Sequence, residues 1–257
     1  QLSLSGTALV SQGNWDYDLI LDSNSGNWTL QQDQVIEKNF YLKSSTLDLN
    51  GKTLTIKGNL IHSGGTLIVN GGTLIVEGDY RIQSFTTDVD GNVNYGYSMG
   101  RLAMTNNLDK VLVKGDFVMD STENHGSALT AGELKLLSNF TQLSSNGCTF
   151  CRYNFNTSGT HRVVLSGTTK QTVSFEDPNY NRSHFNELEI TNSSVEGVEL
   201  TSRVIVTNEL VATTTPIINS DQLSLSGTAL VSQGNWNYDL ILDSNSGNWT
   251  LQQDQVI

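Results

Sequence analysis

The chain has 257 residues, of which 16% are charged, 23 are Gly and 2 are Pro, a composition that favours strands joined by turns. Lys and Arg number 14 against 26 Asp and Glu, and the formal net charge of −12 opposes binding to nucleic acid or anionic lipid. No stretch approaches the roughly 18 consecutive apolar residues of a membrane span, so we expect none in this sequence.

The first 36 residues return almost letter for letter at the end of the sequence. Residues 1–36 and 222–257 differ at one position, where Asp16 is replaced by Asn237. The offset is 221 residues, so the sequence predicts one full repeat unit over 1–221 and the start of a near-identical unit over 222–257. We therefore expect the neighbouring units of the parent protein to be partners that stack end to end.

Two tryptophans lie in this repeated segment. Trp15 and Trp28 each follow a Gly-Asn pair, and they return as Trp236 and Trp249. Aromatic side chains on a strand face are a platform for stacking on sugar rings, so one hypothesis makes Trp15 and Trp28 ligand-binding residues. The alternative is that both rings cap the core or seal the junction between units.

A shorter repeat begins at Thr46. The sequence TLDLNGKTLTIKGNL at 46–60 is followed by TLIVNGGTLIVEGDY at 66–80, and its last four positions recur around Phe117 and Phe140, and less clearly around Leu210 and Phe40. Apolar and polar residues alternate, which is typical of a half-buried strand. Because an isolated coil cannot bury its apolar face, we expect the coils to stack. The predicted fold is all-β, a right-handed parallel β-helix of about 20-residue coils with inserted loops.

This alignment gives expectations for three side chains. Asn50 and Asn70 share one corner of the coil, where we expect their amides to form a ladder. His62 takes the inward position that Leu42 and Ile82 fill in neighbouring coils, so we expect it in the core.

The first inserted loop, at 85–99, contains Asp88, Asp90, Asn92 and Asn94. Oxygen-bearing side chains at alternate positions resemble the front half of a calcium loop, although the distal acidic ligand of an EF-hand is lacking. Calcium is the one cofactor that this sequence suggests. The alternative is a plain hairpin with a type I′ turn at Asp90-Gly91.

Two further inserted loops, at 122–131 and 145–158, carry the remaining reactive side chains. His125 follows Asp120 closely, but no nucleophile or oxyanion motif accompanies them, so we expect a solvated loop rather than an acid–base site. Cys148 and Cys151 form C-T-F-C, which fits a local disulfide, free thiols or half of a metal site. In an exported protein the disulfide is favoured. We assign no catalytic residue and expect no enzymatic activity.

Two long runs complete the pattern, GRLAMTNNLDKVLVKGDFVMDS at 100–121 and GTHRVVLSGTTKQTVSFEDPNYNRSHFNELEITNSS at 159–194. With the short repeats, they resemble the β-helical tandem repeats of very large secreted or cell-surface proteins of Gram-positive-type bacteria. The resemblance implies an extracellular structural or adhesive role and no catalytic motif. We expect a stiff rod or fibre module; the alternatives are a module that binds carbohydrate or a cell surface, and a polysaccharide-degrading enzyme.

Overall fold

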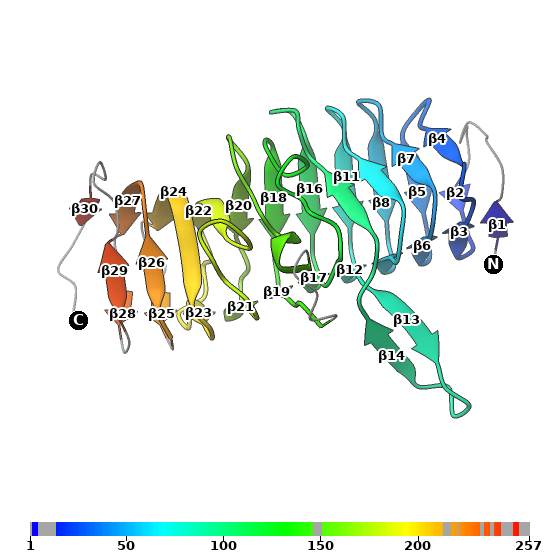
Figure 1. Cartoon of the computed structure of the whole chain (residues 1–257). Coiled ribbons are helices and arrows are strands. Elements are labelled where there is room, and N and C mark those ends of the chain that lie inside the picture. The colour runs from blue at the N-terminus through cyan, green and yellow to red at the C-terminus, as the bar shows by residue number, and fades with distance from the viewer. Residues whose placement is uncertain are drawn as a thin grey trace.

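The computed structural model describes residues 2–4, 14–145, 151–212, 217–219, 221–231, 234–236, 239–242 and 249–251. In this part of the chain the fold is all-β, and its one helical element is η1, a short 3-10 turn at Cys151–Tyr153. The strands stack into an elongated body, with β1 at one end and β30 at the other (Figure 1). The predicted all-β stack of parallel strands is confirmed.

The chain passes round three faces, which we number in the order in which it meets them; one passage round all three is a circuit. The first face is an eleven-stranded parallel sheet. Its strands are β1 (Leu2–Leu4), β3 (Leu19–Leu21), β6 (Phe40–Leu42), β9 (Leu60–His62), β12 (Tyr80–Ile82), β17 (Phe117–Met119), β19 (Phe140–Gln142), β21 (Gln171–Phe175), β23 (Val198–Leu200), β25 (Ile217–Asn219) and β28 (Gly234–Trp236).

The second face begins as a four-stranded sheet and continues as isolated bridges. Met104 bridges Leu129, and Asn156 bridges His184. Two long strands then extend this face, because Phe185 of β22 pairs with Val206 of β24. In order, the elements are β4 (Asn27–Thr29), β7 (Thr46–Asp48), β10 (Thr66–Ile68), β15 (Arg101–Ala103), the bridged residues, the first parts of β22 (Phe185–Ile190) and β24 (Val204–Ala212), β26 (Leu223–Leu225) and β29 (Leu240–Leu242).

The third face holds the second parts of the same two long strands, since Glu187–Ile190 of β22 pair with Glu209–Ala212 of β24. The alignment of Leu210 with Phe117 and Phe140, which begin strands of the first face, is therefore wrong. Leu210 pairs with Leu188 on the third face. The other elements are β2 (Asn14–Trp15), β5 (Gln34–Ile36), β8 (Thr53–Ile56), β11 (Thr73–Val76), β16 (Lys110–Val113), β18 (Glu133–Leu136), β20 (Arg162–Leu165), β27 (Thr228–Val231) and β30 (Trp249–Leu251).

The core runs along the inside of the three faces. Leu47 pairs with Leu67 and Leu54 with Leu74, so equal side chains lie above one another as the sequence predicts. His62 pairs with Leu42 and is buried, which confirms its predicted place. Its Nδ1 lies 3.1 Å from the Tyr80 hydroxyl and its Nε2 lies 3.1 Å from the Gly65 carbonyl oxygen.

A ladder of Asp and Asn side chains runs along the corner that precedes the first face. In each circuit a side-chain oxygen accepts the backbone N–H of the equivalent residue in the next circuit, at 2.8 Å between Asn59 Oδ1 and Asp79 N. The members in order are Asp18, Asn39, Asn59, Asp79, Asp116 and Asn139, with Thr172 as the last donor. This side-chain ladder ties successive circuits together in a fixed register.

The ladder expected from Asn50 and Asn70 is wrong. Both residues adopt left-handed backbone, with φ of 50° and 48°, and their amides bond to the preceding circuit instead of to each other. Asn50 Nδ2 donates to the Leu30 carbonyl oxygen, and Asn70 Nδ2 donates to the Asp48 carboxylate.

We expect Asn59→Ala to lower the free energy of unfolding by about 1–2 kcal/mol, because the half-buried N–H of Asp79 loses its acceptor. Asn59→Asp keeps the oxygen and should cost clearly less. Denaturant unfolding of the two variants measures the difference. Equal losses would mean that the side-chain oxygen does not carry the effect.

Candidate functional site

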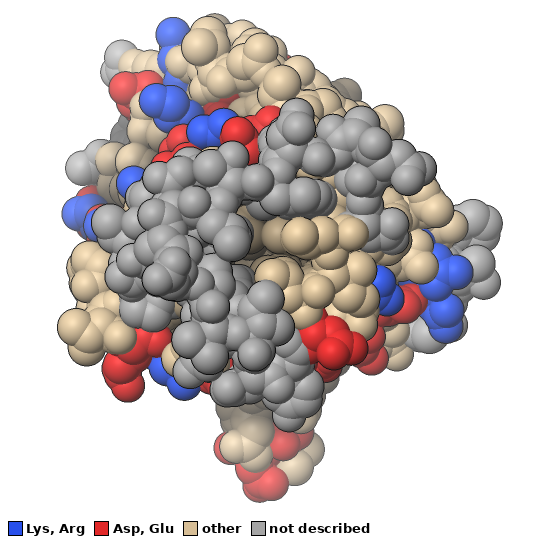
Figure 2. Space-filling view, turned by 90° about the vertical axis from the view of Figure 1, so that its left-hand side faces the viewer, with Lys and Arg blue, Asp and Glu red and all other residues tan. Residues whose placement is uncertain are grey.

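The inserted loops all leave the body at one corner, which we call the loop corner. Segments 83–100, 120–132 and 176–184 each follow a strand of the first face, as does the described part of 143–161. The first of them is a hairpin that projects far from the body (Figure 1). In the view along the stack from its C-terminal end, the hairpin extends below the body (Figure 2).

The hairpin consists of β13 (Ser84–Thr87) and β14 (Val93–Gly96), paired antiparallel. A hairpin is what the sequence predicts, but the type I′ turn at Asp90-Gly91 is wrong. That turn needs positive φ at Asp90, whereas Gly91 alone has it here, at 85°. The loop instead closes with the N–H of Gly91 donating to the Asp88 carbonyl oxygen at 3.1 Å.

Of the four residues suggested for calcium, Asp88 is already bonded within the turn. Its Oδ1 accepts the backbone N–H groups of Asp90 and Asn92 at 3.0 and 2.8 Å, and its Oδ2 accepts Asn92 Nδ2 at 3.0 Å. The hydrogen bonds from Asn92 lower the pKa of the Asp88 carboxyl. Among the described residues no three His, Cys, Asp or Glu side chains gather as metal ligands. This geometry favours a turn cap at Asp88.

The hairpin exposes apolar side chains to solvent. Phe85 is pinned to the body by the ring of Tyr41, 5.3 Å away between centroids, and Tyr95 by the guanidinium of Arg81, 4.6 Å from the ring centroid. The exposed large apolar residues of the hairpin and its base are Val89, Val93, Tyr95, Tyr97 and Met99. Most large exposed apolar side chains of the described chain are on this hairpin and its base.

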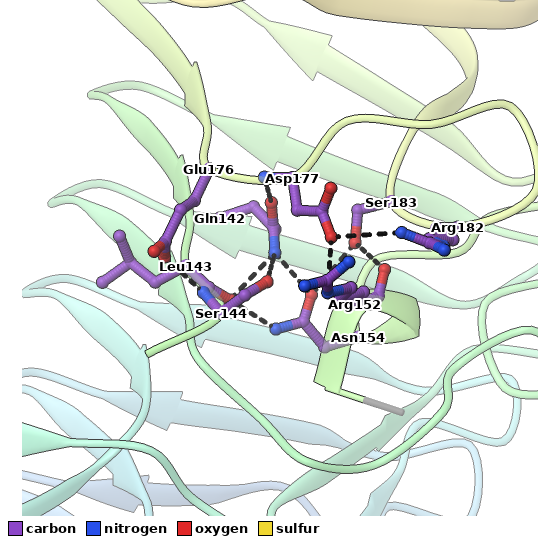
Figure 3. A network of polar contacts seen from close by, with 9 residues as sticks. All are labelled: Gln142, Leu143, Ser144, Arg152, Asn154, Glu176, Asp177, Arg182 and Ser183. Atoms are coloured by element: carbon purple, nitrogen blue, oxygen red, sulfur yellow. Dashed lines mark hydrogen bonds and ion pairs between the residues drawn. The ribbon is translucent and has the colours of Figure 1, made fainter. Parts of the chain in front are cut away.

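A polar network fastens the inserted loops at 143–161 and 176–184 to the first face (Figure 3). Gln142 of β19 is buried, and its Nε2 donates to Ser144 Oγ at 2.9 Å and to Asn154 Oδ1 at 3.0 Å. Ser183 Oγ donates to the carbonyl oxygen of Arg152 at 2.9 Å. Because the buried members have partners, the network acts as a clasp between loops from different circuits.

At the outer edge of this clasp, Asp177 lies between two arginines. Its Oδ2 is 3.0 Å from Arg152 Nε and 3.5 Å from Arg182 Nη1. The carboxylate is thus paired from both sides, and the Ser183 hydroxyl beside it donates to the Arg152 carbonyl oxygen. The arrangement holds loops from different circuits in place.

The loop at 122–131 corrects the expectation for His125, which is buried and not solvated. Its Nε2 accepts the N–H of Leu102 at 3.1 Å, which leaves Nδ1 to donate to the Glu123 carbonyl oxygen. Asp120 is also buried, and its carboxylate accepts the N–H and hydroxyl of Ser145. Each group therefore has its own structural partner.

All four histidines are buried. His161 has no hydrogen-bond partner for either ring nitrogen in the described structure, and burial lowers its pKa to about 3. Burial also lowers the pKa of His125 to about 3 and that of His62 to about 4. The sequence placed His62 but offered no signal for His161 and His184, which follow irregular insertions.

The two tryptophans have different outcomes. Trp28 is 1% exposed and pairs with Leu47 on the second face, so its ring belongs to the core and is not available for stacking on a sugar. The ligand-binding hypothesis for Trp28 is therefore wrong, and the core-capping alternative fits. Trp15 lies in β2, but its side chain is outside the described part of the chain.

The predicted disulfide falls outside the described residues. Cys148 lies in the segment 146–150, and only the backbone of Cys151, in η1, is described. The redox state of this pair stays a prediction.

A charged groove on the third face was not predicted from sequence. The strand register sets Lys110, Glu133, Arg162, Glu187 and Glu209 in one column, with opposite charges next to each other as far as Glu187. Arg162 reaches Glu187 and Glu189 at 3.1 Å each. The groove has a volume of about 360 Å³ and is lined by Asn107, Asp109, Lys110, Gly132, Glu133, Thr160, Arg162 and Glu187. Opposite charges that face each other across strands support the stack.

Comparisons with known proteins found no family model, no curated protein and no solved structure that matches this chain. In the described residues no helix has the length and apolar character needed to cross a membrane.

Proposed function

We propose that the chain is a structural module of a secreted or cell-surface bacterial protein, in which tandem units join into one stiff rod. The finer form of the fold in this proposal is a right-handed β-helix of about 20-residue coils, with unit boundaries at 221 and 222. The resemblance to repeats of very large surface proteins supports the location. In this role the chain is a scaffold and not an enzyme.

One observation carries the proposal. The strands of the second copy lie directly on those of the first unit: Leu225 of β26 pairs with Val206 of β24, and Leu242 pairs with Leu225 in turn. Parallel pairing therefore runs from the unit into its neighbour. A lone stack leaves its last strands with unpaired backbone groups and an open core, which the next copy covers.

The proposal predicts the length of an array. Each added unit should lengthen the particle by roughly 45 Å, since strands stack about 4.8 Å apart over 9 to 10 circuits. Electron microscopy of chains with one, two and three complete units measures the increment. Globular beads on thin linkers would contradict the rod.

A second candidate function is carbohydrate or cell-surface binding, and the exposed hairpin favours it. Tyrosine joins an apolar ring to a polar hydroxyl, which suits the face and edge of a sugar ring. Tyr95 and Tyr97 are exposed side chains of this kind at the loop corner.

For this candidate we expect Tyr95→Ser with Tyr97→Ser to weaken retention on a bacterial or host glycan array by at least about tenfold. The matched control is Leu108→Ser with Val195→Ser, which removes two exposed apolar side chains elsewhere. If both double variants bind like the parent chain, or if the parent binds no glycan, the hairpin is not a carbohydrate site.

A further inference from the structure

The two copies of the repeated segment occupy different faces of the same stack. Leu2–Leu4 form β1 on the first face, whereas their equivalents Leu223–Leu225 form β26 on the second face. The pairing within each copy is nevertheless the same. Leu2 pairs with Leu19 in the first copy, and Leu223 pairs with Leu240 in the second.

Each strand of the copy whose equivalent in the first copy is also described shows this displacement. Asn14–Trp15 of β2 lie on the third face, and their equivalents Asn235 and Trp236 of β28 lie on the first. Trp28 of β4 lies on the second face, and its equivalent Trp249 of β30 lies on the third. First goes to second, second to third and third to first, so the whole copy is advanced by one face.

The strand order gives the size of the unit in circuits. From β1 to β25 the first face holds ten successive strands, which makes nine circuits, and β26 then follows one face further on. A unit of 221 residues therefore contains nine and one third circuits. A unit with a whole number of circuits would return each strand to the face where its equivalent began.

We infer that successive units of the array are rotated by one third of a circuit, in the direction in which the chain winds. This inference rests on the proposed stacking of units. The hairpin leaves the body between the first and second faces, because β12 precedes it and β15 follows it. In the next unit it leaves between the second and third faces, and in the unit after that between the third and first.

The consequence is a rod whose hairpins point in three directions and repeat every three units. Within one unit the inserted loops share the loop corner, but the array presents that corner on all sides. The partner that covers the end of each unit is a second copy of the unit, placed one face ahead. The exposed Tyr95 and Tyr97 of each copy are therefore carried round the rod.

Cross-linking in the 257-residue chain tests the rotation. Asn235→Cys is combined in turn with a cysteine in the first unit: Ile218→Cys on the first face or Val211→Cys on the third. Since Asn235 pairs with Ile218 in β25, a short bifunctional maleimide should join only that pair. An unrotated copy would bring Asn235 to the third face, where its equivalent Asn14 lies.

The positive control is Thr55→Cys with Ile75→Cys, a directly paired couple in the middle of the stack. Cys148 and Cys151 are replaced by Ser throughout. We expect the Ile218 couple to cross-link as fully as the control. Cross-linking of the Val211 couple in its place would overturn the rotation and leave the rod intact. If the control couple cross-links and no Asn235 couple does, both the rotation and the stacking are overturned.

Discussion

Lowering the pH from 7 to 5 should cost the folded chain about 6 kcal/mol of its free energy of unfolding. The cause is three fully buried histidines, His62, His125 and His161, whose pKa values burial lowers to about 4, 3 and 3. The unfolded chain takes up protons below its ordinary histidine pKa of about 6.5 and the folded chain does not, so each contributes about 2 kcal/mol by pH 5.

The sign follows from the direction of the shifts. Because the folded pKa values lie below the unfolded one, the stability is complete above about pH 6.5 and falls progressively as the pH drops toward 3 or 4. Carboxylates with lowered pKa, such as Glu77 and Asp88, act only below their ordinary pKa values of about 4.5 and 3.8. The interval between pH 6.5 and 5 therefore isolates the histidines.

Guanidinium unfolding at pH 7 and pH 5 measures the loss, with His161→Leu as the matched variant. Both ring nitrogens of His161 lack partners, so leucine should not destabilise the chain at pH 7 and should remove about one third of the acid loss. Equal stability of the parent chain at the two pH values would contradict the buried, neutral histidines.

The second large effect is expected at Gly78, where the backbone lies close against the neighbouring circuit. A Cβ on Gly78 would lie 2.8 Å from the carbonyl oxygen of Gly58 and would also meet the side-chain oxygen of Asn59. Backbone cannot yield as a flexible side chain can, so Gly78→Ala should push two circuits apart and cost about 3 kcal/mol.

Gly96→Ala is the control, because its Cβ would meet only the flexible hydroxyl of Ser84, at 3.2 Å, in the projecting hairpin. We expect that variant to change the free energy of unfolding by less than about 0.5 kcal/mol. Denaturant unfolding compares the two alanines. A Gly78→Ala variant as stable as Gly96→Ala would show that the circuits are not packed as closely as described.

The regular part of the stack was predictable because each coil forms the same strands and turns, and the same residue pattern recurs with each of them. Leu47 and Leu67 fall in register since each coil must bury one face, and no other arrangement serves both segments. The ladder through Asn59, Asp79 and Asp116 was visible in the same alignment as Asn or Asp at an equivalent position. The Asn-Gly pairs at Asn50 and Asn70 instead mark left-handed turns, where the backbone conformation and not a side-chain ladder requires asparagine.

The inserted loops were less predictable, because they do not repeat. Their length suggested solvated segments, yet the loop at 122–131 crosses the second face and supplies its missing strand through Leu129, which bridges Met104. His125 is buried by that crossing. The partners of Gln142 likewise come from a loop whose return path no pattern in the sequence marks.

The hairpin shows how far local rules extend. Asp90-Gly91 between two polar strands indicates a hairpin, and one is present. The turn type depends on whether the Asp88 carboxylate accepts the backbone N–H groups of the loop, as it does here. The spacing of residues in the sequence does not show whether these hydrogen bonds form in preference to those of a type I′ turn. Tyr95 and Tyr97 are exposed because the hairpin points away from the body. Its direction is set by contacts with Tyr41 and Arg81 of the body, which the sequence of the hairpin does not show.

The account depends most directly on strands that lie one above another in parallel, whatever their separation in sequence. Spin labels at Thr55 paired with Lys135, Glu189 or Val211, all in one column of the third face, test it by pulsed EPR. The labels are three, five and six strands apart, so the distances should be about 14, 24 and 29 Å, rising by about 4.8 Å for each strand crossed. Distances that do not rise steadily in this order would contradict the stack.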